Sequence, residues 1–194
     1  MFGFNMSIGG NGGNGGHHGH HGHHGHHHHN NQGFNVQVNT GFGQNSWVPS
    51  PGAHYRLVSG LSSKMVLDVS QHHMEKNHLI LYEWHNSANQ KFYFQSAGNN
   101  KWGIFSVGSN LTVEIPNSST FKGTRVVCSQ PNMQQNEMWE LVPANFMGKP
   151  NAFYLRSHSG QVMDVYGGEC KNEAHVVQWD YNGNNNQIWV IEQI

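Results

Sequence analysis

The sequence predicts an all-β domain built from three copies of one unit. A fixed order of short β-prone runs recurs three times between Tyr55 and Ile194, with a period of about 50 residues. The runs are rich in β-branched and aromatic residues, Ser/Gly/Asn clusters separate them, and none has helical periodicity. About twelve short strands in three equivalent groups can close into a barrel capped by three hairpins, which leaves no exposed sheet edge.

The three copies occupy about residues 55–97, 98–143 and 150–194. An acidic residue marks each copy, and an aromatic residue closes it. The acidic markers lie 46 and 50 residues apart and the closing aromatics 47 and 50 apart; they are Asp68, Glu114 and Asp164, and Phe92, Trp139 and Trp189. Because the closing aromatics follow the repeat and lie between apolar neighbours, we expect them in the core.

Composition divides the 194-residue chain near residue 50. Residues 1–50 are dominated by Gly, His and Asn and bury too little apolar surface to offset chain ordering, so we expect a disordered tail before a domain at 51–194. Neutral imidazoles bind Zn, Ni and Cu, but no carboxylate lies nearby to orient the rings, which favours incidental binding of divalent metal. Residues 17–29 hold ten histidines: His17, His18, His20, His21, His23, His24, His26, His27, His28 and His29.

Charge and cysteine usage argue against several classes of function. The net charge is −1 with 11% charged residues, so no basic field would attract nucleic acid or an anionic membrane. Cys128 and Cys170 lack the spacing of a thiolate metal site or a disulfide framework, and no cofactor motif is present. Without a secretory signal or an apolar run long enough to span a bilayer, a cytoplasmic location is expected, with unconventional secretion as the alternative.

Two motifs recur in register, and they carry a resemblance. The segments Asn89-Gln-Lys-Phe and Asn186-Gln-Ile-Trp each follow a strand that contains Leu-Asp-Val or Met-Asp-Val. In this order the chain resembles the ricin B-type lectins over about 140 residues. The resemblance implies a β-trefoil with up to three sugar sites, one in each repeat, usually for galactose or N-acetylgalactosamine.

A shallow sugar site needs a carboxylate that accepts from two hydroxyls, an amide that donates and accepts, and a ring beneath the apolar face of the sugar. The resemblance assigns these roles to Asp68, Tyr82, Asn89 and Gln90 in repeat one. In repeat three it assigns them to Asp164, Trp179, Asn186 and Gln187, with the Gly167–Gly168 turn leaving room for a ligand.

Repeat two departs from this pattern. Glu114 replaces the aspartate, Cys128 stands where the ring is expected, and Glu137 replaces the glutamine. Because the stacking ring supplies the main apolar contact, we predict that repeat two is a structural copy only. Two other assignments stay open: Gln90 and Gln187 could hold the loop by bonding strand backbone, and the aspartates could cap turns.

The residues just after the rings also stay open. Trp84 and His85 in repeat one, and Tyr181 and Asn182 in repeat three, could form a second wall of a site or pack within the hairpin.

The function predicted from these features is a non-enzymatic lectin that binds glycans or glycoproteins through repeats one and three. A glycosidase needs two carboxylates about 5–10 Å apart, whereas Asp68 and Asp164 belong to different repeats, and no catalytic motif is present. The alternative is a β-trefoil protein-binding module, such as a protease inhibitor or a structural or coat protein, without sugar binding.

Overall fold

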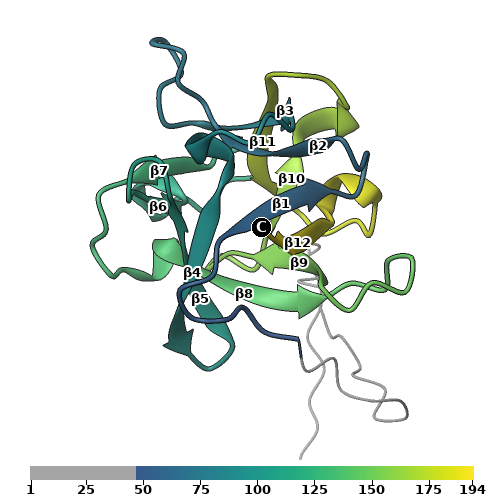
Figure 1. Ribbon diagram of the computed structural model, residues 1–194. Helices are drawn as coiled ribbons and strands as arrows, with labels where there is room; N and C mark the ends of the chain where they lie inside the picture. The colour runs from purple at the N-terminus through teal and green to yellow at the C-terminus, as the bar shows by residue number, and fades with distance from the viewer. Residues whose placement is uncertain (1–46) are drawn as a thin grey trace, which may run out of the picture. The chain divides into compact units, whose positions relative to one another are not determined.

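The computed structural model describes residues 47–194, in which every regular element except single 3₁₀ turns is a β-strand (Figure 1). Twelve strands form one sheet system, which confirms the all-β prediction. They are β1 (Tyr55–Ser59), β2 (Met65–Val69), β3 (Leu79–Glu83), β4 (Phe92–Gly98), β5 (Lys101–Ser106), β6 (Thr112–Glu114), β7 (Val127–Ser129), β8 (Met138–Pro143), β9 (Ala152–Arg156), β10 (Val162–Val165), β11 (Ala174–Trp179) and β12 (Trp189–Gln193).

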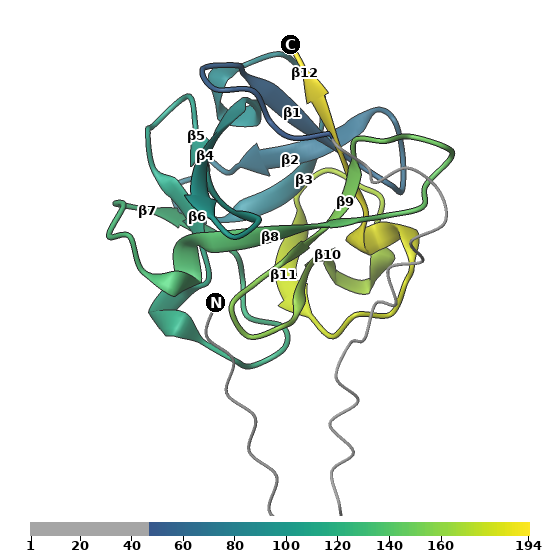
Figure 2. The same ribbon diagram turned by 90° about the horizontal axis from the view of Figure 1, so that it is seen from below.

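Six of the strands close into a barrel. Strand β1 pairs with β12, β12 with β9, β9 with β8, β8 with β5, β5 with β4, and β4 returns to β1, all antiparallel. Figure 2 shows β1 and β12 lying side by side where the first and last strands meet. Because each strand has two neighbours, the barrel presents no free edge.

The other six strands form three hairpins, β2–β3, β6–β7 and β10–β11. Strand β3 pairs with β11, and single bridges join His78 to Val127 and Arg125 to Val177. Each hairpin therefore contacts the other two, and the loop of one repeat lies against the hairpin of the next. This arrangement gives the β-trefoil predicted from the repeats.

The core contains apolar side chains from all three repeats, and the closing aromatics are among its largest members. Phe92, Trp139 and Trp189 are fully buried, as expected from their spacing. Trp139 Nε1 donates to the carbonyl of Val113 at 2.9 Å, and Trp189 Nε1 to the carbonyl of Met163 at 3.3 Å. Each indole thus ties the last strand of its repeat to the strand that carries the acidic marker.

The domain begins earlier than the sequence predicts. Trp47, assigned above to the tail, packs on Tyr55 and Phe153 with ring centroids 6.0 and 5.5 Å apart, and the Ser50 N–H donates to the Tyr55 hydroxyl at 2.7 Å. Trp47 and Ser50 therefore contact the barrel, because the tryptophan ring packs on two of its aromatic residues. Residues 1–46, with the predicted disorder and the histidine tract, lie outside the described residues.

Within residues 47–194, no helix is long and apolar enough to cross a membrane. In the same range, no group of three or more His, Cys, Asp or Glu side chains is arranged to hold a metal ion.

Candidate carbohydrate-binding site

Repeat three contains an open pocket of about 360 Å³ at the end of the β10–β11 hairpin. Three of the four residues assigned to this repeat line it, together with the double-glycine turn. Its lining residues are Asp164, Tyr166, Gly167, Gly168, Trp179, Asn182, Asn184 and Asn186. Gly167 and Gly168 have φ of +64° and +67°, which glycine adopts without strain, and they add no side chain to their part of the pocket wall.

The hairpin register places the carboxylate and the ring on one face. Asp164 pairs with Val177 and Val162 pairs with Trp179, and alternate residues of a strand point to the same side. Asp164 is only 2% exposed, whereas Trp179 is half-buried. Burial raises the pKa of Asp164 to about 6, although the Gln187 and Asn186 amides favour the charged form. The pocket thus combines a poorly hydrated acceptor with an accessible indole.

Gln187 forms hydrogen bonds with three residues at the site. Its Nε2 donates to Asp164 Oδ2 at 2.8 Å and to the carbonyl of Asp180 at 2.9 Å, while its Oε1 accepts from the N–H of Asn182 at 2.8 Å. Gln187 is fully buried and does not line the pocket, so it orients the carboxylate and the loop. Asn186 lines the pocket while its Nδ2 donates to the carbonyl of Val165 at 3.1 Å.

Two contacts on Trp179 were not foreseen from the sequence. The ring of Tyr166, from the same repeat, meets the indole edge-on at 5.7 Å. Lys122, from the β6–β7 loop of repeat two, places its Nζ 5.5 Å from the indole centroid and 3.6 Å from Asp180 Oδ2. Tyr166 directly follows the Met-Asp-Val segment, so its position in the sequence could have indicated a role at the site. Lys122 lies 57 residues before the ring it contacts, and no motif indicates that contact.

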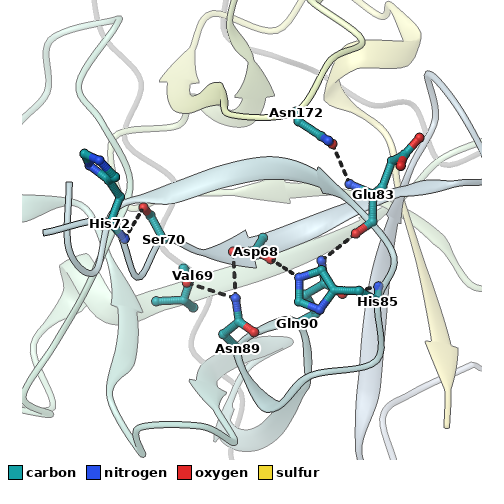
Figure 3. A network of polar contacts seen from close by, with 9 residues as sticks. All are labelled: Asp68, Val69, Ser70, His72, Glu83, His85, Asn89, Gln90 and Asn172. Atoms are coloured by element: carbon teal, nitrogen blue, oxygen red, sulfur yellow. Dashed lines mark hydrogen bonds and ion pairs between the residues drawn. The ribbon is translucent and has the colours of Figure 1, made fainter. Parts of the chain in front are cut away.

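Repeat one brings the same residue types together, but in a closed arrangement (Figure 3). Asn89 Nδ2 donates to Asp68 Oδ1 at 2.9 Å, and His85 Nε2 lies 3.5 Å from Asp68 Oδ2. The His85 ring also meets Tyr82 edge-on at 5.7 Å. Gln90 is fully buried and repeats the role of its counterpart: its Nε2 donates to the carbonyl of Glu83, and its Oε1 accepts from the N–H of His85, both at 2.8 Å.

In repeat two the structure corrects one assignment. The rings pair with the residue two places before the carboxylate, Tyr82 with Val66 and Trp179 with Val162. The corresponding pair in repeat two is Ser129 with Thr112, so Ser129, and not Cys128, occupies the ring position. A shift of one residue turns a strand side chain to the opposite face, and Cys128 accordingly belongs to the hydrophobic core. Repeat two still lacks a stacking ring.

The carboxylate–amide pair nevertheless persists in repeat two. Asn136 Nδ2 donates to Glu114 Oε2 at 3.0 Å and to the carbonyl of Ile115 at 3.0 Å. Glu137 has no donor, and its two oxygens accept from the N–H groups of Asn132 at 2.7 Å and Met133 at 2.8 Å. The hydrogen bond between Asn136 and Glu114 therefore joins the end of a hairpin strand to the loop after the hairpin, independently of any ligand.

Glu137→Gln should destabilise the domain by about 1–2 kcal/mol, because the Met133 N–H would lose a charged acceptor. The free energy of urea unfolding measures the effect. Glu83→Gln is the control, since it removes the same charge from an exposed side chain. Equal stability of the two variants would contradict the role given to Glu137.

Comparison with known proteins agrees with the geometry. A model of the ricin-type beta-trefoil lectin domain family matches residues 53–189. No curated protein was found to match the sequence. Solved structures match: a designed threefold-symmetric protein, ThreeFoil, is 26% identical with a TM-score of 0.66, and the match covers 73% of this chain and 99% of that one.

Two natural structures are similar at lower identity. The ricin B-like lectin of Macrolepiota procera, solved with lactose, is 22% identical with a TM-score of 0.65 over 76% of this chain and 100% of that one. An exo-beta-1,3-galactanase from Clostridium thermocellum is 23% identical with a TM-score of 0.63 over 76% of this chain but 31% of that one. The fold thus occurs both alone and within a longer enzyme.

Fold and site together define a β-trefoil domain with an open polar and aromatic pocket in its third repeat. The chain belongs to the ricin-type beta-trefoil lectin domain family, since the family match spans most of its length. Membership supports carbohydrate binding as the general class of function, and domains of this family are generally non-enzymatic.

Proposed function

We propose that the chain is a lectin whose repeat-three pocket binds a galactose- or N-acetylgalactosamine-type residue of a glycan or glycoprotein. The observation that carries the proposal is the convergence of Asp164, Trp179 and Asn186 on one open pocket. These side chains supply an acceptor for paired hydroxyls, an apolar platform and an amide, which are the groups that a pyranose needs.

The chemistry of galactose suits this arrangement. Its axial O4 hydroxyl gathers the polar groups to one side and leaves a patch of C–H groups on the other. The C–H patch would lie on the indole of Trp179, while two adjacent hydroxyls would donate to Asp164. Asn186 would bond a hydroxyl with the part of its amide that the Val165 carbonyl does not use.

Two similar structures support the choice of sugar. Lactose, bound by the Macrolepiota procera lectin, ends in galactose, and the Clostridium thermocellum enzyme acts on a galactan. Both are below 25% identical to this chain, so they support the proposal only through the shared fold.

Trp179→Ala should weaken binding about tenfold, because a stacked ring contributes about 1.4 kcal/mol beyond its buried area. A glycan array would first identify the bound sugar, and isothermal titration would then measure its affinity. Trp84→Ala is the matched control, since Trp84 stacks under Arg56 and lies outside the pocket.

An array on which the wild-type chain binds no glycan would reject the proposal and favour the protein-binding β-trefoil. Binding that Trp179→Ala leaves unchanged would place the sugar elsewhere on the domain.

A further inference from the structure

We propose that His85 occupies the sugar position of repeat one, so that the chain has one open site and one site closed by its own side chain. The inference rests on the proposed function, because it concerns where the same sugar can bind. It names His85 as the residue that distinguishes the two repeats.

The first observation is the position of the imidazole. In the site proposed for repeat three, the sugar lies in the pocket lined by both the carboxylate and the ring. In repeat one His85 lies beside the corresponding carboxylate and ring instead: its Nε2 is 3.5 Å from Asp68 Oδ2, and its ring meets Tyr82 at 5.7 Å with an interplanar angle of 80°. Because Asn89 approaches the other oxygen at 2.9 Å, both oxygens of Asp68 face a protein group (Figure 3).

The second observation is the matching residue in repeat three. The N–H of His85 donates to Gln90 Oε1 and that of Asn182 donates to Gln187 Oε1, both at 2.8 Å. The next residues, Asn86 and Gly183, both have a left-handed backbone, with φ of +65° and +76°. The two loops thus follow the same path, and the difference lies in the side chain.

The third observation is where empty space lies. In repeat three the cavity includes both Asp164 and Trp179. Near repeat one, a cavity of about 280 Å³ includes Asn89 and residues 69–71, 76–77, 106 and 108–109, but neither Asp68 nor Tyr82. The cavity beside the amide therefore extends toward repeat two, and it does not reach the carboxylate or the ring of repeat one.

The closure is reversible by a side-chain rotation. The His85 side chain is 41% exposed, and its 3.5 Å approach to Asp68 is longer than a strong hydrogen bond. Apparent affinity falls with the fraction of time that a site is open, so a site open for roughly a tenth of the time binds about tenfold more weakly. We expect repeat one to bind at least about tenfold more weakly than repeat three.

A reciprocal exchange of these two side chains tests the inference on the full chain. His85→Asn should raise the affinity of repeat one about tenfold, giving two sites of similar strength, whereas Asn182→His should weaken repeat three by about the same factor. Titration calorimetry with lactose and with N-acetylgalactosamine gives the stoichiometry. Side-chain NMR signals of Tyr82 and Trp179 report the two sites separately.

Two further variants separate the loss of a side chain from the gain of an imidazole. His85→Ala should open repeat one as His85→Asn does, and Asn182→Ala should weaken repeat three less than Asn182→His.

The outcomes distinguish this inference from the proposed function. A wild-type chain in which Tyr82 and Trp179 respond at the same sugar concentration overturns the inference alone, as does a His85→Asn chain in which only Trp179 responds. If no variant binds sugar and neither ring responds, the proposed function fails and the inference fails with it.

Discussion

Asp164→Asn should weaken sugar binding about a hundredfold, the largest single effect expected in this domain. A carboxylate accepts from two sugar hydroxyls at once, whereas an asparagine offers one acceptor and turns an N–H₂ group toward the second hydroxyl. Hydrogen bonds to charged groups contribute about 1.5–3 kcal/mol each, and a hundredfold loss corresponds to about 2.7 kcal/mol. Isothermal titration with the best ligand from the array measures the loss.

The same substitution should not unfold the domain. The carbonyl oxygen of the introduced amide can still accept from Gln187 Nε2, as Asp164 Oδ2 does at 2.8 Å. Burial raises the pKa of Asp164, so the charged form costs stability as the pH rises through about 6, and a neutral amide avoids this cost. At pH 7.5 we expect a stability gain on the order of 1 kcal/mol, discounted because the pocket admits water, and no gain below about pH 4.

Asp68→Asn is the matched control. Repeat one has the same carboxylate but a closed site, so the affinity of repeat three should stay within about twofold of the wild type. A large loss with Asp68→Asn and none with Asp164→Asn would exchange the roles of the two repeats.

The fold was predictable from the sequence because characteristic residues recur at a regular spacing in the three repeats. The closing aromatics recur with the period, are fully buried, and define the barrel core. The sequence alone, however, did not determine which of two adjacent residues occupies the ring position in repeat two. Ser129 and Cys128 are neighbours, and only the pairing of Thr112 with Ser129 shows which of them lies on the ring face.

The residue types of the candidate site were predictable from the sequence, but whether each site is open or closed was not. The sequence places a carboxylate, a ring and an amide in repeats one and three, and the structure brings both sets together. In the inference proposed above, whether the repeat-one site is open depends on the rotamer of His85, which no spacing determines. Contacts such as Lys122 on Trp179 depend on how two repeats pack, so they also lie beyond any motif within one repeat.

The carboxylate–asparagine pair occurs in repeats both with and without a stacking ring. Asn89 and Asn136 both donate to the carboxylate of their repeat, although repeat two has no ring. Retention of the acidic residue and the asparagine therefore supports the architecture of the hairpin as much as sugar binding. The stronger indicator of a site is a stacking ring with open space beside it, as at Trp179.

Sugar binding by repeat three should fall as the pH is lowered through about 6. Burial raises the pKa of Asp164 to about 6, and the protonated carboxyl loses one acceptor and the charge. The affinity should be constant above about pH 7, and it should fall about tenfold by pH 5 and about a hundredfold by pH 4 as the carboxylate is protonated. Titration calorimetry across this range gives the pH midpoint of the loss of affinity. The ¹³C shift of the Asp164 carboxyl, followed by NMR, gives the midpoint of its protonation. Since the chain has seventeen histidines that also titrate near this range, agreement of the two midpoints is the decisive result. Affinity that stays constant down to about pH 4.5 would show that Asp164 does not accept from the sugar.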